Sequence, residues 1–417
     1  MGEKTFAADK FYTKAGMLDI TSREPLTVAF LGGSLTEGHV DYEGTSLGDD
    51  RLKWANVMIK FLSGLFPHRP LKAVNSGLGG TGTEYGAARF YRDILRHDPD
   101  LIFIEFSCND TLHQPSDRSE KGRTERQIYL EGIIRQCMKR EKVPVIIYMH
   151  VPLPYEDDAL DRYLTGCEYK QQILDYYGIG TVDAMADFRR QFEVEVAEND
   201  ALTLHDCFDR YYKRNPNTPY VSYDVHPNGE GYLLFAKSLI NAIVHEPEKY
   251  FRRFEMKHTP YRADFSDKIE AKYTYISASD ERIKYVGDWE IYTKDNKFVT
   301  DDPDTLIRED KFIAPHQFPD GIGQVLMPKG AEFSFVTSAD EILMPHVSAR
   351  AGLEATVYVN GVALGKTGCR SIYHGMNFLG PRIALPKGEK TVKFVIDDAD
   401  DKSRVFRFGY IIEVFFG

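Results

Sequence analysis

The sequence predicts an α/β domain followed by a second domain of antiparallel β-strands. Over residues 1–247, short apolar runs alternate with segments of helical spacing, which is typical of a parallel sheet with helices on both faces. Over residues 268–417, short β-rich runs follow one another, which is typical of a β-sandwich of the jelly-roll kind. A chain of 417 residues with 42% hydrophobic residues is long enough to form two cores.

The elements of the first domain can be assigned in order along the chain. Apolar runs rich in β-branched and aromatic residues predict strands at 27–31, 73–76, 101–106 and 143–149. Apolar residues at helical spacing predict helices at 51–65, 83–96, 123–139, 161–177 and 231–243. Because strands and helices alternate, we expect three layers with a parallel sheet in the middle.

The second domain is predicted from strands alone. These fall at 289–293, 332–336, 342–349, 355–359, 391–396 and 406–416. Asn360-Gly361 lies between two apolar runs and is a strong hairpin signal, because both residues readily adopt positive φ. Residues 248–267 are charged and contain proline, so we expect a linker there.

Four polar segments interrupt or follow the apolar runs of the first domain. Ser34 follows the first run after Gly32-Gly33, Gly80 follows the second, Asn109 follows the third, and His226 lies near the end of the domain. Because the carboxyl ends of parallel strands meet at one edge of a sheet, we expect these residues to lie close together.

These four segments resemble the four sequence blocks of the SGNH (GDSL-like) hydrolase family. The resemblance implies a flavodoxin-like three-layer fold, with Ser34 as a nucleophile and His226 as the base that takes its proton. It also implies an oxyanion hole built from the Ser34 backbone N–H, the Gly80 backbone N–H and the Asn109 side-chain amide. The chain departs from the family where Ser107 replaces the glycine that usually begins the third block.

The acid of the triad is the second departure. The family places an aspartate three residues before the histidine, but Tyr223 occupies that position and Asp224 lies only two residues before His226. Asp224 therefore orients the imidazole only if the segment bulges; otherwise it is a turn residue and the site is a Ser-His dyad. Asp206 and Asp209 are more distant alternatives, better explained as solvated loop acids.

A dinucleotide-binding site is the competing interpretation of one segment. Residues 77–82 match the pattern G-x-G-x-x-G, which would make the chain an oxidoreductase. The acidic residue expected at the end of the next strand is missing, because that strand is followed by Ser107-Cys108-Asn109. Residues 33–38 have the two glycines of a phosphate-binding P-loop, but His39 and Val40 stand where lysine and a hydroxyl residue are required.

Charge and composition limit the partners. A net charge of −11 argues against nucleic acid and anionic membranes. The first residues lack the apolar core of a signal peptide and no stretch is long enough to span a bilayer, so we expect a cytoplasmic protein. The five scattered cysteines lack metal-ligand spacing, and we expect reduced thiols with neither a metal nor another cofactor.

The sequence therefore predicts a serine esterase that removes small acyl groups, acetyl above all, from a small-molecule or oligosaccharide ester. Lysophospholipase or thioesterase activity on the same fold remains an alternative, and a non-catalytic sugar-binding protein is a third. Tyr155, His150 and His113 are candidate substrate contacts at the carboxyl edge of the sheet. The second domain would bind sugar, shape the rim of the cleft or mediate a homo-oligomer.

Overall fold

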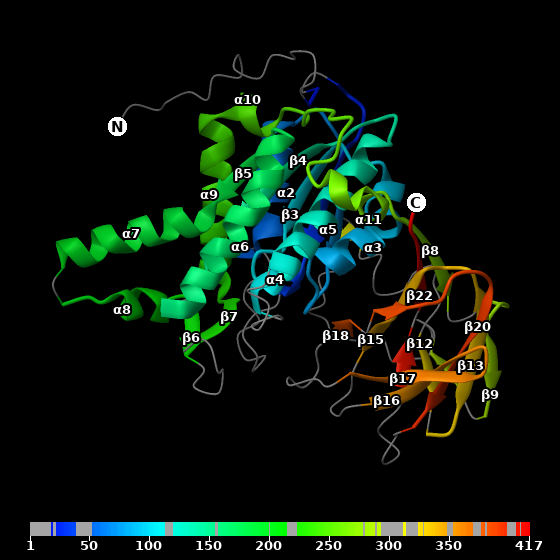
Figure 1. Cartoon of the computed structure of the whole chain (residues 1–417). Coiled ribbons are helices and arrows are strands. Elements are labelled where there is room, and N and C mark those ends of the chain that lie inside the picture. The colour runs from blue at the N-terminus through cyan, green and yellow to red at the C-terminus, as the bar shows by residue number, and fades with distance from the viewer. Residues whose placement is uncertain are drawn as a thin grey trace.

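The computed structural model shows an α/β layer structure joined to a set of antiparallel sheets (Figure 1). The residues that it describes are 18–19, 22–38, 52–112, 120–154, 157–199, 201–214, 223–277, 280–287, 290–292, 312–313, 324–327, 329–347, 353–369, 377–379, 382–397, 406–408 and 410–417. His113 and Tyr155, two of the predicted substrate contacts, lie outside these residues.

A parallel sheet forms the centre of the first domain. Its strands are β1 (Leu26–Gly32), β2 (Leu71–Gly77), β3 (Leu101–Glu105), β4 (Val145–His150) and β5 (Gly180–Asp183). They lie in the order β2-β1-β3-β4-β5, and each pairs with its neighbour in parallel. This is the flavodoxin-like order, whose switch point next to β1 is where such sheets place ligands. The predicted fold class is confirmed.

Helices cover both faces of this sheet. Val28 and Phe30 of β1 point to one face, where the Phe30 ring lies 5.2 Å from that of Trp54. That face is covered by α2 (Trp54–Leu65) and α9 (Gly229–His245). Ala29 and Leu31 point to the opposite face, which is covered by α3 (Thr83–Asp93), α5 (Glu120–Met138) and α6 (Asp157–Tyr176). The period of two along β1 therefore divides the core into two layers.

A strand and a long helix of the first domain are among the elements that were not predicted from the sequence. β5 contains only one buried aliphatic residue, Val182, and forms the outer edge of the sheet, so its apolar signal is weak. It leads directly into α7 (Ala184–Glu198), where the Asp183 side chain accepts the Ala186 N–H as a cap. α7 buries only a few residues, and Figure 1 shows it projecting from the body of the domain.

The second domain consists of antiparallel strands. A five-stranded sheet has the order β17-β16-β20-β13-β9, and a four-stranded sheet has the order β19-β14-β22-β8. Their bounds are β8 (Lys272–Ser277), β9 (Lys284–Val286), β13 (Glu332–Thr337), β14 (Glu341–Leu343), β16 (Leu353–Val359), β17 (Val362–Cys369), β19 (Ile383–Ala384), β20 (Lys390–Ile396) and β22 (Tyr410–Phe415). The predicted turn at Asn360-Gly361 joins β16 to β17, and both residues have positive φ.

Smaller antiparallel sheets complete this domain. β12 (Gln324–Met327) pairs with β10 (Glu290–Tyr292) and with β21 (Phe406–Phe408), and β15 (Pro345–Val347) pairs with β18 (Asn377–Leu379). β11 (Phe312–Ile313) instead joins the parallel sheet beside β2. The continuous strands predicted at 342–349 and 406–416 are wrong, because each run supplies strands to two different sheets, as chains do at sandwich corners.

The second domain packs against α3 of the first. A shared buried cluster consists of Leu78, Tyr85, Ala88, Ala271, Leu343, Ile412 and Val414. The Tyr275 hydroxyl donates to the Ala88 carbonyl at 2.5 Å, and Arg382 lies 3.3 Å from Glu84. The stretch 248–267 packs along the first domain, where Phe251 and Phe254 are buried.

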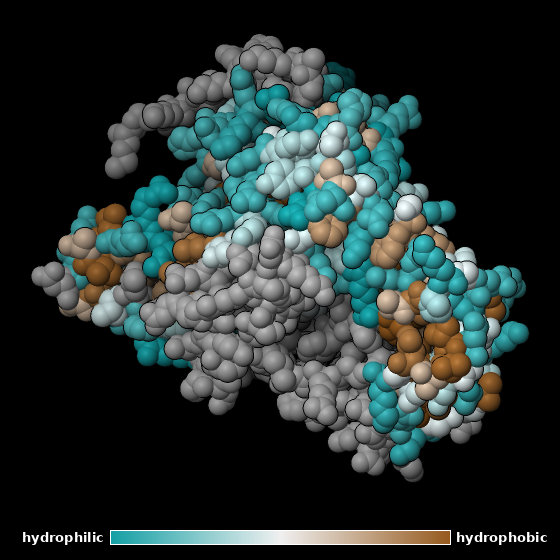
Figure 2. All heavy atoms as spheres, in the orientation of Figure 1, coloured by the Kyte–Doolittle hydropathy of each residue, from teal (hydrophilic) through white to brown (hydrophobic). Residues whose placement is uncertain are grey.

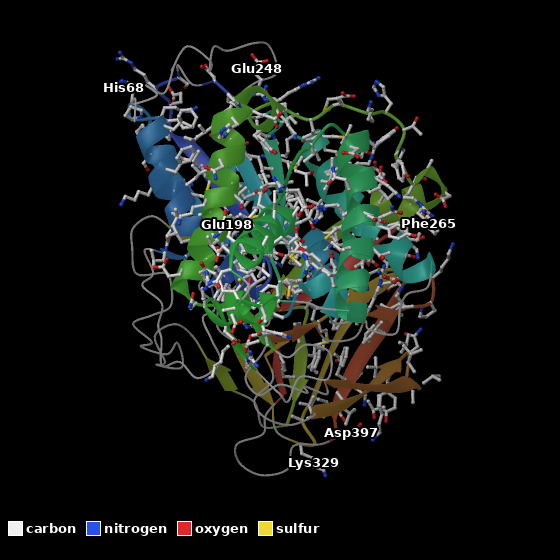
Figure 3. All side chains as sticks on the ribbon, turned by 90° about the vertical axis from the view of Figure 1, so that its left-hand side faces the viewer. His68, Glu198, Glu248, Phe265, Lys329 and Asp397 are labelled. Carbon is white, nitrogen blue, oxygen red and sulfur yellow. The ribbon has the colours of Figure 1, made fainter. Side chains whose placement is uncertain are left out.

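The surface is mostly polar, with local apolar areas. Figure 2 shows hydrophobic residues over the antiparallel sheets and near the projecting end of α7. Exposed aliphatic residues at these places include Val336, Val362 and Val194. In Figure 3, His68 and Glu248 lie at the end of the molecule opposite to Lys329 and Asp397, which belong to the second domain. Among the described helices, none combines the length and hydrophobicity that crossing a bilayer requires.

Candidate active site

Ser34 lies at the carboxyl end of the central strand β1. The buried strand ends at Gly32, and Ser34 is the first residue of the short helix α1 (Ser34–Glu37). The Trp54 indole N–H donates to the Leu35 carbonyl at 2.9 Å and so holds this helix against α2. Only 5% of Ser34 is exposed, and its hydroxyl therefore has a fixed environment at the sheet edge.

His226 reaches Ser34 from the far end of the domain's sequence. It belongs to β7 (Tyr223–Pro227), which precedes α9, and the Asn228 side chain caps that helix by accepting from the Gly231 N–H. The His226 Nε2 and Ser34 Oγ atoms are 2.8 Å apart. The two side chains, 192 residues apart in sequence, are thus within hydrogen-bonding distance, as a nucleophile and its base require.

Asp224 also contacts His226. Its Oδ1 atom lies 2.7 Å from the His226 Nδ1 and accepts the His226 backbone N–H at 2.9 Å. The second bond is an Asx-turn, so the roles of turn former and imidazole partner, which were alternatives in the sequence, coincide on one oxygen. Burial raises the pKa of Asp224, but the hydrogen bond and charge of His226 outweigh it and hold that pKa below its ordinary value.

The strand that carries Asp224 and His226 pairs irregularly with its neighbour. β7 pairs with β6 (Tyr212–Arg214), and Tyr212 is opposite Pro227 while Arg214 is opposite Tyr223. Five residues of β7 therefore face three of β6, and the ladder is irregular between them. Residues two apart in a strand point to the same side, so Asp224 and His226 can meet, and the irregular pairing bends the strand locally.

The alternative acids lie elsewhere. Asp206 forms a capping box with Thr203 at the start of α8 (Leu204–Asp209). Asp209 is paired with Arg214 at 2.7 Å. Both have local partners on the surface, in agreement with their interpretation as solvated loop acids.

Gly80 and Asn109 lie in the two loops that flank Ser34. Gly80 follows β2 and has φ of 75°, a left-handed conformation that favours glycine. The preceding residue, Gly79, donates its N–H to the Glu37 carboxylate at 2.7 Å, which ties this loop to α1. Asn109 begins α4 (Asn109–Leu112), and its amide lies so close to Gly33 that a Cβ there would be 2.7 Å from its Oδ1.

Two carboxylates already accept hydrogen bonds from backbone N–H groups that a bound dinucleotide would need. Its pyrophosphate would bind the glycine loop and the first N–H groups of the following helix. Here Glu37 accepts the Gly79 N–H, and Asp110 accepts the N–H of Thr83, the first residue of α3, at 2.8 Å. Negative charge at both positions disfavours phosphate, so the geometry speaks against the oxidoreductase interpretation.

Glu105 and His150 are buried beneath the site. Burial raises the pKa of Glu105 to about 7, although its Oε1 accepts from Ser107 at 3.0 Å. Burial lowers the pKa of His150 to about 3, and only 3% of this residue is exposed. His150 is therefore neutral and enclosed. It belongs to the core, and the prediction that it contacts substrate finds no support in its burial.

Replacing Glu105 by glutamine should remove a pH dependence of stability. The pKa of Glu105 is higher in the folded state than in the unfolded state, so its protonated carboxyl contributes fully to the stability of the fold below pH 4.5. This contribution is lost as the pH rises through 7. The difference in unfolding free energy between Glu105→Gln and the parent should therefore change by on the order of 3 kcal/mol between pH 4.5 and 8. Urea unfolding at both pH values measures this, with the exposed Glu198→Gln on α7 as control. Parallel pH curves for parent and variant would contradict it.

The arrangement can activate a hydroxyl for attack on a carbonyl. Asp224 accepts from one imidazole nitrogen of His226, which leaves the other nitrogen to receive the Ser34 proton. The Asn109 amide lies against Gly33, the residue before this serine, and Glu37 of α1 holds the loop that carries Gly80. Among the described residues, no cluster of histidine, cysteine and carboxylate side chains has a geometry that suits a metal ion.

Comparisons with known proteins give a family match and structures of similar fold. Residues 30–234 match the GDSL-like Lipase/Acylhydrolase family. A search of curated proteins found no related sequence. In structure, the chain is similar to a two-domain esterase (CEX) active on acetylated mannans, with 19% identity, a TM-score of 0.63, and coverage of 94% of this chain and 92% of that chain.

Two further structures are similar. The same mannan esterase co-crystallised with mannopentaose matches with 18% identity, a TM-score of 0.63, and coverage of 95% of this chain and 92% of that chain. An acetylxylan esterase from Geobacillus stearothermophilus has 19% identity and a TM-score of 0.40, and covers 52% of this chain and 94% of its own. The mannan esterase shows that both domains of this chain, and not only the first, have a known counterpart in fold.

Proposed function

Because residues 30–234 belong to the GDSL-like lipase/acylhydrolase family of ester hydrolases, we propose that the chain is a serine esterase that removes acetyl groups from carbohydrates. The observation that carries the proposal is the continuous hydrogen-bond chain from Asp224 to His226 to Ser34, with distances of 2.7 and 2.8 Å. Those atoms have the spacing of a nucleophile, its base and the acid that orients the base.

The proposed reaction passes through an acyl-enzyme. Ser34 Oγ attacks the ester carbonyl while its proton moves to His226 Nε2, and the carbonyl oxygen becomes an oxyanion. The Ser34 and Gly80 backbone N–H groups and the Asn109 amide would donate to that oxyanion. The C–O bond to the sugar then breaks, and the sugar oxygen takes the proton from His226. Water, deprotonated by His226, releases the acyl group and restores Ser34.

The acetyl-carbohydrate substrate rests on the likeness to the two-domain mannan esterase. That likeness extends over both domains, and the related protein was crystallised with mannopentaose. For this chain we propose the same class, an acetylated oligosaccharide. The sugar and the esterified position are left to experiment.

A substrate panel tests the proposal. The full chain should release acetate from acetylated mannan or xylan oligosaccharides, and a fluorophosphonate probe should label Ser34, as located by peptide mass spectrometry. Among p-nitrophenyl esters, the acetyl ester should be hydrolysed with the highest kcat/KM. A preference for acyl chains of eight carbons or more would support a lysophospholipase or thioesterase instead. The absence of both labelling and hydrolysis would refute the esterase proposal.

Replacing Gly33 by alanine should lower kcat by displacing Asn109. The Gly33 φ of −89° is accessible to alanine, so the effect is steric: the new Cβ would lie 2.7 to 3.0 Å from three atoms of the Asn109 amide. Loss of one oxyanion donor costs about 100-fold or more in kcat. Steady-state kinetics on an acetyl ester measure this, and KM should change little.

A matched glycine provides the control for this variant. Gly64 lies inside α2, and a Cβ there would meet nothing within 4 Å. Gly64→Ala should leave kcat unchanged and stabilise the chain by about 0.5–1 kcal/mol, because alanine is the better helix former. Equal kcat values for Gly33→Ala and Gly64→Ala would rule out the proposed place of Asn109 in the reaction.

A further inference from the structure

A buried ion pair lies behind the candidate site. The Lys170 ammonium, on α6, is 2.8 Å from Asp110 Oδ2, and the two side chains are 1% and 5% exposed. Lys170 also approaches the Phe106 carbonyl, at 3.4 Å, where the chain leaves β3. Desolvation largely cancels the attraction in such buried pairs, and apolar residues of similar size often serve stability as well. Stability alone therefore does not explain why two charges stand here.

The second oxygen of Asp110 joins two loops. Oδ1 accepts the Thr83 backbone N–H at 2.8 Å, and the Thr83 hydroxyl lies 3.2 Å from both carboxylate oxygens. A Cβ on Gly82 would be only 2.3 Å from Oδ1, so the loop can approach the carboxylate this closely only because residue 82 has no side chain. Thr83 begins α3 three residues after Gly80, and Asp110 directly follows Asn109.

We propose that Asp110 is a positioning residue that fixes the spacing of the two loops that carry oxyanion donors, and that Lys170 fixes Asp110. This inference rests on the proposed esterase function, because the spacing matters only if an oxyanion forms between the loops. Asp110 does not touch the substrate; it acts through Thr83 on one side and Asn109 on the other.

The consequence for catalysis follows from the geometry of an oxyanion hole. Donors stabilise the transition state only if they lie about 2.7–3.1 Å from the position that the oxyanion will occupy. The N–H of Gly80 and the amide of Asn109 come from different loops, so their separation depends on whatever joins those loops. A carboxylate held by a buried ammonium cannot rotate away from Thr83. The pair should therefore affect kcat and leave substrate binding unchanged.

Two double variants isolate this link. In both, Lys170→Met removes the ammonium, so no unpaired buried charge remains. Asp110→Asn then keeps an oxygen for the Thr83 N–H, whereas Asp110→Leu has the same branched shape without an acceptor. On an acetyl ester, we expect Asp110→Asn/Lys170→Met to lose no more than about fivefold in kcat and Asp110→Leu/Lys170→Met to lose about 100-fold. KM should stay within about twofold in both.

Inhibition by phenylboronic acid separates positioning from general stability. The boron atom would bond to Ser34 Oγ and place a negatively charged tetrahedral group in the oxyanion hole, so its inhibition constant should rise in parallel with the loss of kcat/KM. Ile133→Ala, on the buried side of α5, serves as the control: it should lower the melting temperature without changing kcat or boronate affinity at 25 °C.

The outcomes distinguish this inference from the proposed function. Wild-type kcat and boronate affinity in Asp110→Leu/Lys170→Met, or equal losses in the two double variants, would overturn it. If the leucine variant does not fold, Lys170→Met alone decides, with at least about tenfold lower kcat and boronate affinity expected, and wild-type values overturning the inference. A parent chain without esterase activity would instead refute the proposed function itself.

Discussion

Ser34→Ala should lower kcat for acetyl-ester hydrolysis about a millionfold, to the level left by the oxyanion donors alone. The Ser34 hydroxyl is the group that His226 Nε2 contacts at 2.8 Å, and alanine offers no atom that can form the acyl-enzyme. The cavity that it leaves is small because only one oxygen is removed from a site that is 5% exposed. The fold should therefore persist, and thermal melting should change little.

Acetate release and fluorophosphonate labelling measure this together. Both should disappear in Ser34→Ala, while binding of an unhydrolysed oligosaccharide is kept. Ser63→Ala is the matched control, because Ser63 lies on α2 and only donates to the Ile59 carbonyl. Labelling that persists in Ser34→Ala would show that another residue is the nucleophile.

Asp224→Asn should lower kcat by about 10⁴-fold, because a neutral amide neither stabilises the imidazolium that forms when His226 takes the Ser34 proton nor fixes the ring tautomer. Asp224 Oδ1 accepts from both the His226 backbone N–H and the His226 Nδ1. The asparagine oxygen can accept both bonds, but the amide carries no charge. Where the amide turns its NH₂ group toward Nδ1, Nε2 carries the proton and can no longer accept from Ser34.

The pH dependence and a neighbouring aspartate provide the controls. The lowered pKa of Asp224 keeps its carboxylate ionised at neutral pH, so the loss should persist across the neutral range. Asp209→Asn, which weakens the surface pair with Arg214, should retain parent activity. A kcat for Asp224→Asn near that of the parent would favour a Ser-His dyad, in which a backbone group orients the imidazole.

Alternation and buried strands made the architecture of the first domain predictable. β1 and β3 have every residue buried and end at glycine or a polar segment, so both their existence and their edge could be inferred. β5 and α7 could not, because tertiary position rather than local pattern stabilises them: β5 is an edge strand and α7 buries few side chains. The two short strands on either side of Met344 could not be predicted as separate strands either. One apolar run supplies both, and they belong to different sheets.

At the site, the sequence indicated the residues but not their relations. β7 pairs irregularly with β6 around Asp224 and His226, and such an irregularity is a property of two paired strands that one strand's sequence does not reveal. Lys170 carries no local signal at all, since its partner Asp110 is 60 residues away and the pair forms only when α6 packs beside α4. Asp110 does carry a signal in the sequence. It directly follows Asn109, and α3 begins after Gly82, which has no side chain to cap the helix.

The proposed acid and base lie on one short strand, β7. Asp224 and His226 are two residues apart, and one oxygen holds both the ring and the backbone between them. Their mutual geometry is thus encoded by a peptide of a few residues, while only the gap to Ser34 depends on the whole fold. A displacement of β7 relative to Ser34 would therefore break the contact between His226 and Ser34 and stop the proposed reaction. The contact between Asp224 and His226 would stay intact.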